Sequence, residues 1–141
     1  LLKSVDRLLE SAREQGMKVR RLDVEGAFHS SIMAPAAEKM REALQTVKVS
    51  SPSVPFVSAT TAAVEAGAER VKQILTDQLT GPVRFTQAVR ATLALGATGY
   101  VELGARKTLA GLVRRILPDA QVYHLGGVAD VPHIRALVAG G

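Results

Sequence analysis

The chain has 141 residues, enough for one domain with a substantial core and too few for two independent domains. Apolar residues make up 47% and charged residues 22%, which is typical of a folded globular protein and not of a disordered one. The absence of cysteine excludes disulfides, thiolate metal sites and a cysteine nucleophile. The net charge of +5 favours acidic partners, but aromatic residues are only 4%, so we expect no nucleic-acid binding. No apolar stretch approaches the roughly 20 residues that span a bilayer, and we expect no membrane association.

Several segments carry apolar residues at spacings of three and four, the pattern of helices that bury one face. Glycine and proline delimit them, for example Gly16 after the first segment and Gly96 after the fourth. The predicted helices cover residues 1–15, 36–47, 68–79, 85–95, 108–117 and 131–138. The chain opens inside the first of these patterns, without an initiator methionine, so we expect it to be part of a longer protein.

Short segments rich in valine, tyrosine and leucine separate these helices and are predicted to be strands. The predicted strands cover residues 18–24, 54–58, 99–103 and 121–125, and the third should be buried because it is an apolar run between glycines. Helices that alternate with strands indicate a layered α/β domain with mainly parallel strand pairing.

The most informative segment is the loop of residues 26–36, which follows a predicted strand and precedes a helix. Loops in this position often carry the sites of α/β proteins. The loop contains His29, and a histidine can act as a general base at neutral pH because both of its protonation states are accessible. From the residues alone, a structural role for a single loop histidine remains open.

Four motifs lie in order along the chain, at residues 27–31, 54–58, 78–86 and 102–112, and together they resemble those of malonyl transferase and other acyltransferase domains. The segment Ala27-Phe28-His29-Ser30-Ser31 resembles the sequence around the catalytic histidine of that family, and residues 54–58 resemble the strand that follows. Residues 78–86, which read QLTGPVRFT, resemble its Gln-Leu and Pro-Val-Arg-Trp signature, and residues 102–112 resemble its Glu-Leu-Gly strand end and the helix after it. The resemblance covers residues 1 to about 138.

The resemblance implies a malonyl-CoA:acyl carrier protein transacylase that uses a serine and a histidine. In this family a serine of a Gly-His-Ser-Leu-Gly motif attacks the malonyl thioester, and His29 would be the base that takes its proton. The backbone carbonyl at Gln78 would orient the imidazole. Phe28 and Ser30 would contact the substrate, and the ring of Phe28 would favour malonyl over methylmalonyl groups. A core phenylalanine and a solvent-facing glutamine are the alternatives for Phe28 and Gln78.

The nucleophilic serine is not in this chain, which contains no Gly-x-Ser-x-Gly motif. Ser30 is not expected to replace it, because neighbouring residues of an extended loop point their side chains apart. The resemblance therefore implies an enzyme that is inactive as this chain alone and needs the N-terminal part of the same protein. Residues 1–25 would be the end of an inserted ferredoxin-like subdomain, and residues 26–141 the C-terminal portion of an α/β-hydrolase-like large domain.

The resemblance further implies no bound cofactor or metal, with malonyl-CoA and holo acyl carrier protein as substrates in fatty acid biosynthesis. The location would be cytoplasmic in a bacterium and a plastid-type organelle or mitochondrion in a eukaryote. His124 and His133 lack partners at metal-ligand spacing and are expected at the surface or a sheet edge. Ala105 and Arg106 stand where the family's Gly-Pro-Gly-Lys turn has Pro and Gly. We hypothesise that Arg106 and Lys107 contact a phosphopantetheine phosphate or an acidic carrier protein. A non-catalytic carrier-protein-binding module and a fragment of a polyketide synthase acyltransferase domain are the alternative functions.

Overall fold

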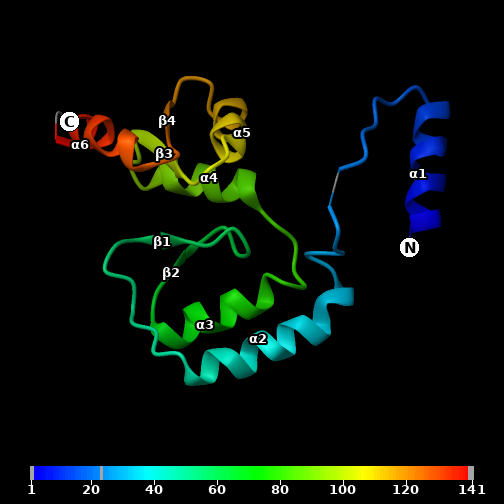
Figure 1. The fold of residues 1–141 in the computed structure, drawn as a ribbon, viewed down its shortest axis with the longest axis horizontal. Helices are drawn as coiled ribbons and strands as arrows, with labels where there is room; N and C mark the ends of the chain where they lie inside the picture. Colours follow the sequence, from blue (N-terminus) through cyan, green and yellow to red (C-terminus); the bar gives the residue numbers. More distant parts are fainter. Residues whose placement is uncertain (1, 23, 140–141) are drawn as a thin grey trace.

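The computed structural model describes residues 2–22 and 24–139 (Figure 1). Every predicted helix is present in these residues, with ends within two residues of the prediction, and only the predicted start at Leu1 lies outside them. The helices and strands in chain order are α1 Leu2–Glu14, η1 Ser31–Met33, α2 Ala34–Thr46, β1 Phe56–Val57, β2 Val64–Glu65, α3 Ala68–Asp77, α4 Phe85–Ala94, β3 Gly99–Leu103, α5 Thr108–Ile116, β4 Gln121–Leu125, η2 Val128–Asp130 and α6 Val131–Ala139.

The helices α2 and α3 pack against each other, and the strands β1 and β2 form a short antiparallel hairpin beside them (Figure 1). Pro35 lies in the first turn of α2, where its missing N–H has no helical acceptor in any case. Ala37 of α2 and Ile74 of α3 are buried. Figure 1 shows α1 apart from this group and from the C-terminal elements.

The C-terminal elements share one hydrophobic core. The strands β3 and β4 pair in parallel, in a register that runs from Gly99 opposite Gln121 to Leu103 opposite Leu125. The helices α4 and α5 cover one side of this pair. The buried centre consists of Val89, Ala110, Val113 and Val122. This core fixes both ends of the loop between β3 and α5.

The strand predicted for residues 18–24 is wrong for the residues that the structure describes. Residues 18–22 and 24 belong to no strand, and Asp23 lies outside the described residues. A strand needs a neighbour for its backbone N–H and C=O groups. No such neighbour lies beside this segment among the described residues, and Leu22 remains 73% exposed. An ion pair of 3.0 Å between Arg21 and Asp6 ties the segment to α1.

The strand prediction for the rest of the chain is correct in part. Strands β3 and β4 have the predicted bounds, whereas β1 is shorter than residues 54–58 and pairs with β2, which was not predicted. Among the strands that the structure describes, parallel pairing therefore holds for β3 and β4 only. The burial predicted for residues 99–103 is wrong, because alternate residues face away from the helices and Leu103 is 73% exposed. Among the described residues, no helix is long and apolar enough to cross a membrane.

Candidate active site

His29 lies in the loop before η1, with an unusual backbone conformation. Its φ of 61° is in the left-handed region that non-glycine residues rarely adopt. The backbone N–H of His29 donates a hydrogen bond of 3.0 Å to the carbonyl oxygen of Leu79. Such a conformation persists only where the surroundings fix it, and this bond is one of the contacts that do so.

The imidazole of His29 makes a second contact with the same turn. Its Nδ1 lies 2.7 Å from the carbonyl oxygen of Gln78. A carbonyl oxygen can only accept a hydrogen bond, so Nδ1 carries the proton and donates it. The neutral ring then has an unprotonated Nε2, and no described residue hydrogen-bonds that atom. The geometry therefore leaves Nε2 free to accept a proton from another group.

The carbonyl of Gln78 is available because it lies at the C-terminal end of α3. The last four carbonyl groups of a helix have no partner within the helix. Gln78 follows the last helical residue, and its own N–H bonds to the carbonyl of Ile74. Its side-chain amide points back along the helix and donates to the carbonyl of Leu75 at 3.3 Å. The contact with His29 thus uses the main chain of Gln78 and not its side chain.

Phe28 and Ser30, the neighbours of His29, take different positions. Phe28 is 53% exposed, and its ring lies so close to Gly26 that a Cβ there would be 2.7 Å away. The hydroxyl of Ser30 donates a hydrogen bond of 2.6 Å to the carbonyl of Ala27. The side chain of Ser30 therefore stabilises the loop that holds His29, and its hydroxyl makes no hydrogen bond to the imidazole.

A family model with the description acyl transferase domain matches residues 2–133. The chain belongs to this acyltransferase family. The curated malonyl CoA-acyl carrier protein transacylase of Bacillus subtilis is 38% identical over 115 residues, which are 81% of this chain and 36% of the relative. A polyketide biosynthesis malonyl CoA-acyl carrier protein transacylase of the same species is 36% identical and is matched over 39% of its length.

The solved structures give the same result. The acyl-carrier-protein S-malonyltransferase of Bartonella henselae is 33% identical and superposes with a TM-score of 0.89, over 97% of this chain and 44% of that one. The predicted α/β class is confirmed by this likeness. The chain spans about two fifths of the length of these relatives.

Glu102 is a residue of the acyltransferase motifs whose role sequence reasoning missed. Its carboxylate accepts hydrogen bonds from the backbone N–H groups of Leu109 at 2.9 Å and Ala110 at 2.8 Å. Burial opposes ionisation of Glu102, but these two bonds, together with the charge of His124 and a bond from the backbone of Thr108, outweigh it and lower the pKa of the carboxyl group below its usual value of 4.5. Glu102 therefore caps the N-terminus of α5, as a negative charge there should.

The other residues considered from the sequence have partners other than His29 or are exposed. The Nε2 of His124 is 2.6 Å from the carbonyl oxygen of Gly104, and the ring of His133 stacks edge-on against that of Tyr123. Arg106 and Lys107 are exposed in the loop before α5. Among the described residues, no group of three histidine, aspartate or glutamate side chains is placed to bind a metal.

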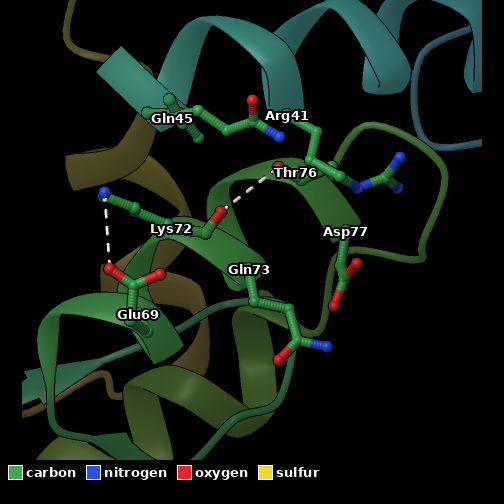
Figure 2. Close-up of a pocket in the computed structure, with 8 residues that line it drawn as sticks. Arg41, Gln45, Glu69, Lys72, Gln73, Thr76 and Asp77 are labelled. Carbon is green, nitrogen blue, oxygen red and sulfur yellow. Dashed lines mark hydrogen bonds and ion pairs between the residues drawn. The ribbon is translucent and has the colours of Figure 1, made fainter. Parts of the chain in front are cut away.

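A polar pocket of about 490 Å³ lies between α2 and α3. Figure 2 shows that its walls carry both charges, with Arg41 from α2 and Glu69, Lys72 and Asp77 from α3. Lys72 and Glu69 form an ion pair of 3.4 Å across one turn of α3. The pocket ends at Asp77, one residue before the carbonyl that contacts His29. None of the residues predicted for the site lines it.

Proposed function

We propose that this chain supplies the histidine base of an enzyme that transfers a malonyl group from coenzyme A to the phosphopantetheine thiol of acyl carrier protein. The observation that carries the proposal is the 2.7 Å contact between Nδ1 of His29 and the carbonyl of Gln78, because it leaves Nε2 as the proton acceptor. The names of the relatives supply the substrates.

The reaction is a double displacement in which Nε2 of His29 moves one proton at each step. The serine hydroxyl of the missing part attacks the malonyl thioester, and Nε2 takes its proton. The C–S bond then breaks, and the proton passes to the leaving thiol of coenzyme A, which leaves a malonyl-serine ester. The phosphopantetheine thiol next gives its proton to Nε2 and attacks the ester. The serine oxygen leaves with that proton, and the malonyl thioester of the carrier protein is the product.

A base is needed because a serine hydroxyl is a weak nucleophile at its own pKa. A positioned base typically contributes about 10² to 10⁴ in rate. The carbonyl of Gln78 would keep the imidazole in one tautomer during both displacements, a role that a carboxylate has in other triads. Metal and cofactor are not required by these steps, and we propose none. Phe28 and Ser30 would contact the acyl group.

The rest of the enzyme would cover apolar surface that this chain leaves exposed. Among the described residues, β3 is bonded only to β4, so its other edge has free backbone groups. A largely apolar pocket of about 250 Å³ lies beside β3 and includes Val57, Val101 and Val113. We propose that the N-terminal part of the enzyme fills this region and that the chain alone is inactive. Residues 26–141 would then complete an α/β-hydrolase-like domain.

Residues 1–25 would end an inserted ferredoxin-like subdomain. The position of α1 apart from the other elements supports this division (Figure 1). The exposure of Leu8, at 70% on the apolar face of α1, also supports it, because an isolated amphipathic helix needs a partner for that face. The remaining strands of the subdomain would supply this partner.

The experiment that tests the function is malonyl transfer from coenzyme A to holo acyl carrier protein by the complete enzyme, with and without the His29→Ala substitution. Loss of transfer in the variant supports the proposal, and unchanged transfer refutes it. The relative named for polyketide biosynthesis makes the carrier protein of a polyketide synthase a second candidate acceptor. A comparison of kcat/KM for carrier proteins of the two pathways would distinguish the acceptors.

A further inference from the structure

The two carbonyl groups that hold His29 belong to a turn, and a distant hairpin fixes that turn. Gln78 and Leu79 follow α3, so the helix alone does not set the direction of their carbonyl groups. The turn closes through two hydrogen bonds to the carbonyl of Asp77, from the N–H of Thr80 at 3.2 Å and of Gly81 at 2.9 Å. Any shift of this turn moves both acceptors of His29 together.

The β1–β2 hairpin contacts the far end of the same turn. The N–H of Arg84 donates a hydrogen bond of 2.7 Å to the carbonyl of Ala59, in the connection between the two strands. Thr60 is also close, because a Cβ on Gly81 would lie 3.8 Å from its methyl carbon and 3.1 Å from the carbonyl oxygen of Asp77. The hydrogen bond of Arg84 therefore ties the far end of the turn to the hairpin, with Thr60 nearby.

The connection of residues 58–63, called here the hairpin turn, is itself held by Ser58. This serine is 3% exposed. Its backbone bonds to Ala63 at 3.1 Å and to Ala62 at 2.7 Å, and its hydroxyl accepts a hydrogen bond of 3.1 Å from the N–H of Thr60. Ala62 has a φ of 58°, a left-handed conformation that an alanine keeps only where its surroundings fix it.

The other end of the hairpin is fixed to the beginning of α3. Arg70 donates to both carboxylate oxygens of Glu65, at 2.9 and 3.4 Å. Figure 1 shows the hairpin between α3 and α4. The same hairpin thus contacts α3 near its first turn and again beyond its last turn. It holds both α3 and the turn after it, whose carbonyl groups bind the histidine.

We propose that the hairpin turn positions His29 and that the hydroxyl of Ser58 is a positioning group of the reaction, through Ala59, Thr60 and the turn of residues 78–84. The inference rests on the proposed function, because the position of His29 matters for turnover only if His29 is the base. In the described part of the chain no hydrogen bond joins Ser58 to the imidazole of His29, so Ser58 acts by limiting the movement of the acceptor carbonyls.

The test compares Ser58→Ala and Ser58→Thr in the complete enzyme, with Thr92→Val as the matched control. Thr92→Val in α4 also removes hydroxyl hydrogen bonds, of 2.8 Å to the carbonyl of Val89 and of 3.2 Å to the hydroxyl of Tyr100, but Thr92 lies outside the hairpin turn. We expect Ser58→Ala to lower kcat about tenfold with KM for malonyl-CoA unchanged, because misplacement of a base reduces turnover more than binding. Ser58→Thr should restore most of the loss, and Thr92→Val should leave kcat unchanged.

A spectroscopic measurement separates positioning from a general loss of stability. The Nδ1 proton of His29 should give a resolved NMR signal in the native enzyme, and Ser58→Ala should shift or broaden it at a temperature where the enzyme is folded. An unchanged signal together with kcat within about twofold of the native value overturns the inference. If Ser58→Ala does not fold, Thr60→Ser, which removes only the methyl group beside Gly81, replaces it with the same two readouts.

The His29→Ala variant distinguishes a failure of the proposed function from a failure of the positioning inference. If it retains activity, the proposed function fails and the positioning inference fails with it. If it loses activity while Ser58→Ala and Thr60→Ser both behave as the native enzyme, only the positioning inference fails.

Discussion

Replacing His29 by alanine in the complete enzyme should abolish most of the turnover. The substitution removes Nε2 and with it the group that would take the serine proton. A general base contributes about 10² to 10⁴ in rate, which corresponds to about 3–5 kcal/mol of transition-state stabilisation. We therefore expect kcat to fall by about 10² to 10⁴, with a smaller change in KM.

Gln78→Ala should change kcat far less than His29→Ala, and this contrast makes the prediction specific. The atom that contacts His29 is the main-chain oxygen, which every residue has, and the side-chain amide bonds only to Leu75. Gln78→Ala should therefore keep kcat within about threefold of the native value, as expected of a substitution that removes no partner of the base. His133→Ala is the control for loss of a histidine elsewhere in the chain, and its kcat should not change.

The assay is malonyl transfer to holo acyl carrier protein at saturating substrate, with each variant checked for native thermal unfolding. A kcat for Gln78→Ala as low as that for His29→Ala would refute the reasoning, because it would mean that the glutamine side chain takes part. A kcat for His29→Ala within about tenfold of the native value would refute the role of the base.

Three further predictions concern other residues of the chain. Phe28→Ala should raise the preference for methylmalonyl over malonyl groups by about 10- to 200-fold in the ratio of kcat/KM values, since one methyl group is discriminated by that amount, and an unchanged ratio would exclude Phe28 from the pocket. Glu102→Gln should lower the unfolding temperature of the complete enzyme at neutral pH. Folding lowers the pKa of Glu102, so its carboxylate stabilises the folded state at pH values above the pKa of the unfolded chain. This stabilisation is lost as the pH falls through the pKa of the folded state. A difference between native and variant enzyme that persists in acid would contradict this. Arg106→Ala combined with Lys107→Ala should raise KM for the carrier protein about tenfold at low salt. The increase should become smaller at higher ionic strength, which screens the charges. An equal KM at low salt would exclude a contact between these two residues and the carrier protein.

The helices could be predicted from the sequence because their signals are local. Apolar spacing fixes the buried face, and residues such as Gly16, with a φ of 74°, and Gly96, with a φ of 91°, end the helices in conformations that favour glycine. The bounds of β3 and β4 were predictable for a similar reason. A short apolar run between breakers leaves little choice of length.

The remaining strands could not be predicted because their partners are not local. Residues 18–22 have the composition of a strand, yet no neighbouring strand lies beside them in the described part of the chain. The β1–β2 hairpin turns through Ala62, where glycine or asparagine would be the usual signal of a left-handed turn residue. An alanine gives no such signal. Its N–H bonds to the carbonyl of the buried Ser58, and Ala59 of the same connection accepts a bond from Arg84, 22 residues after Ala62.

The candidate site likewise combines features of one short segment with contacts between residues far apart in the sequence. The loop position of His29 could be predicted from the sequence, but the partner at Gln78 is 49 residues away and was named only through resemblance. The cap formed by Glu102 was missed because the carboxylate lies on the preceding strand, seven residues before Leu109, instead of in the first turn of α5. Sequence motifs for helix caps describe residues within that turn.

The left-handed conformation of His29 connects these observations. With a φ of 61°, the backbone N–H and the ring Nδ1 reach two consecutive carbonyl groups, those of Leu79 and Gln78, at the end of one helix. Each of these carbonyls follows the last residue of α3 and needs a partner from outside the helix. The histidine satisfies both, and in return the end of the helix fixes its conformation and its tautomer. A residue without a side-chain donor could satisfy Leu79 alone. Histidine makes the second bond with Nδ1 and still has Nε2 to accept a proton.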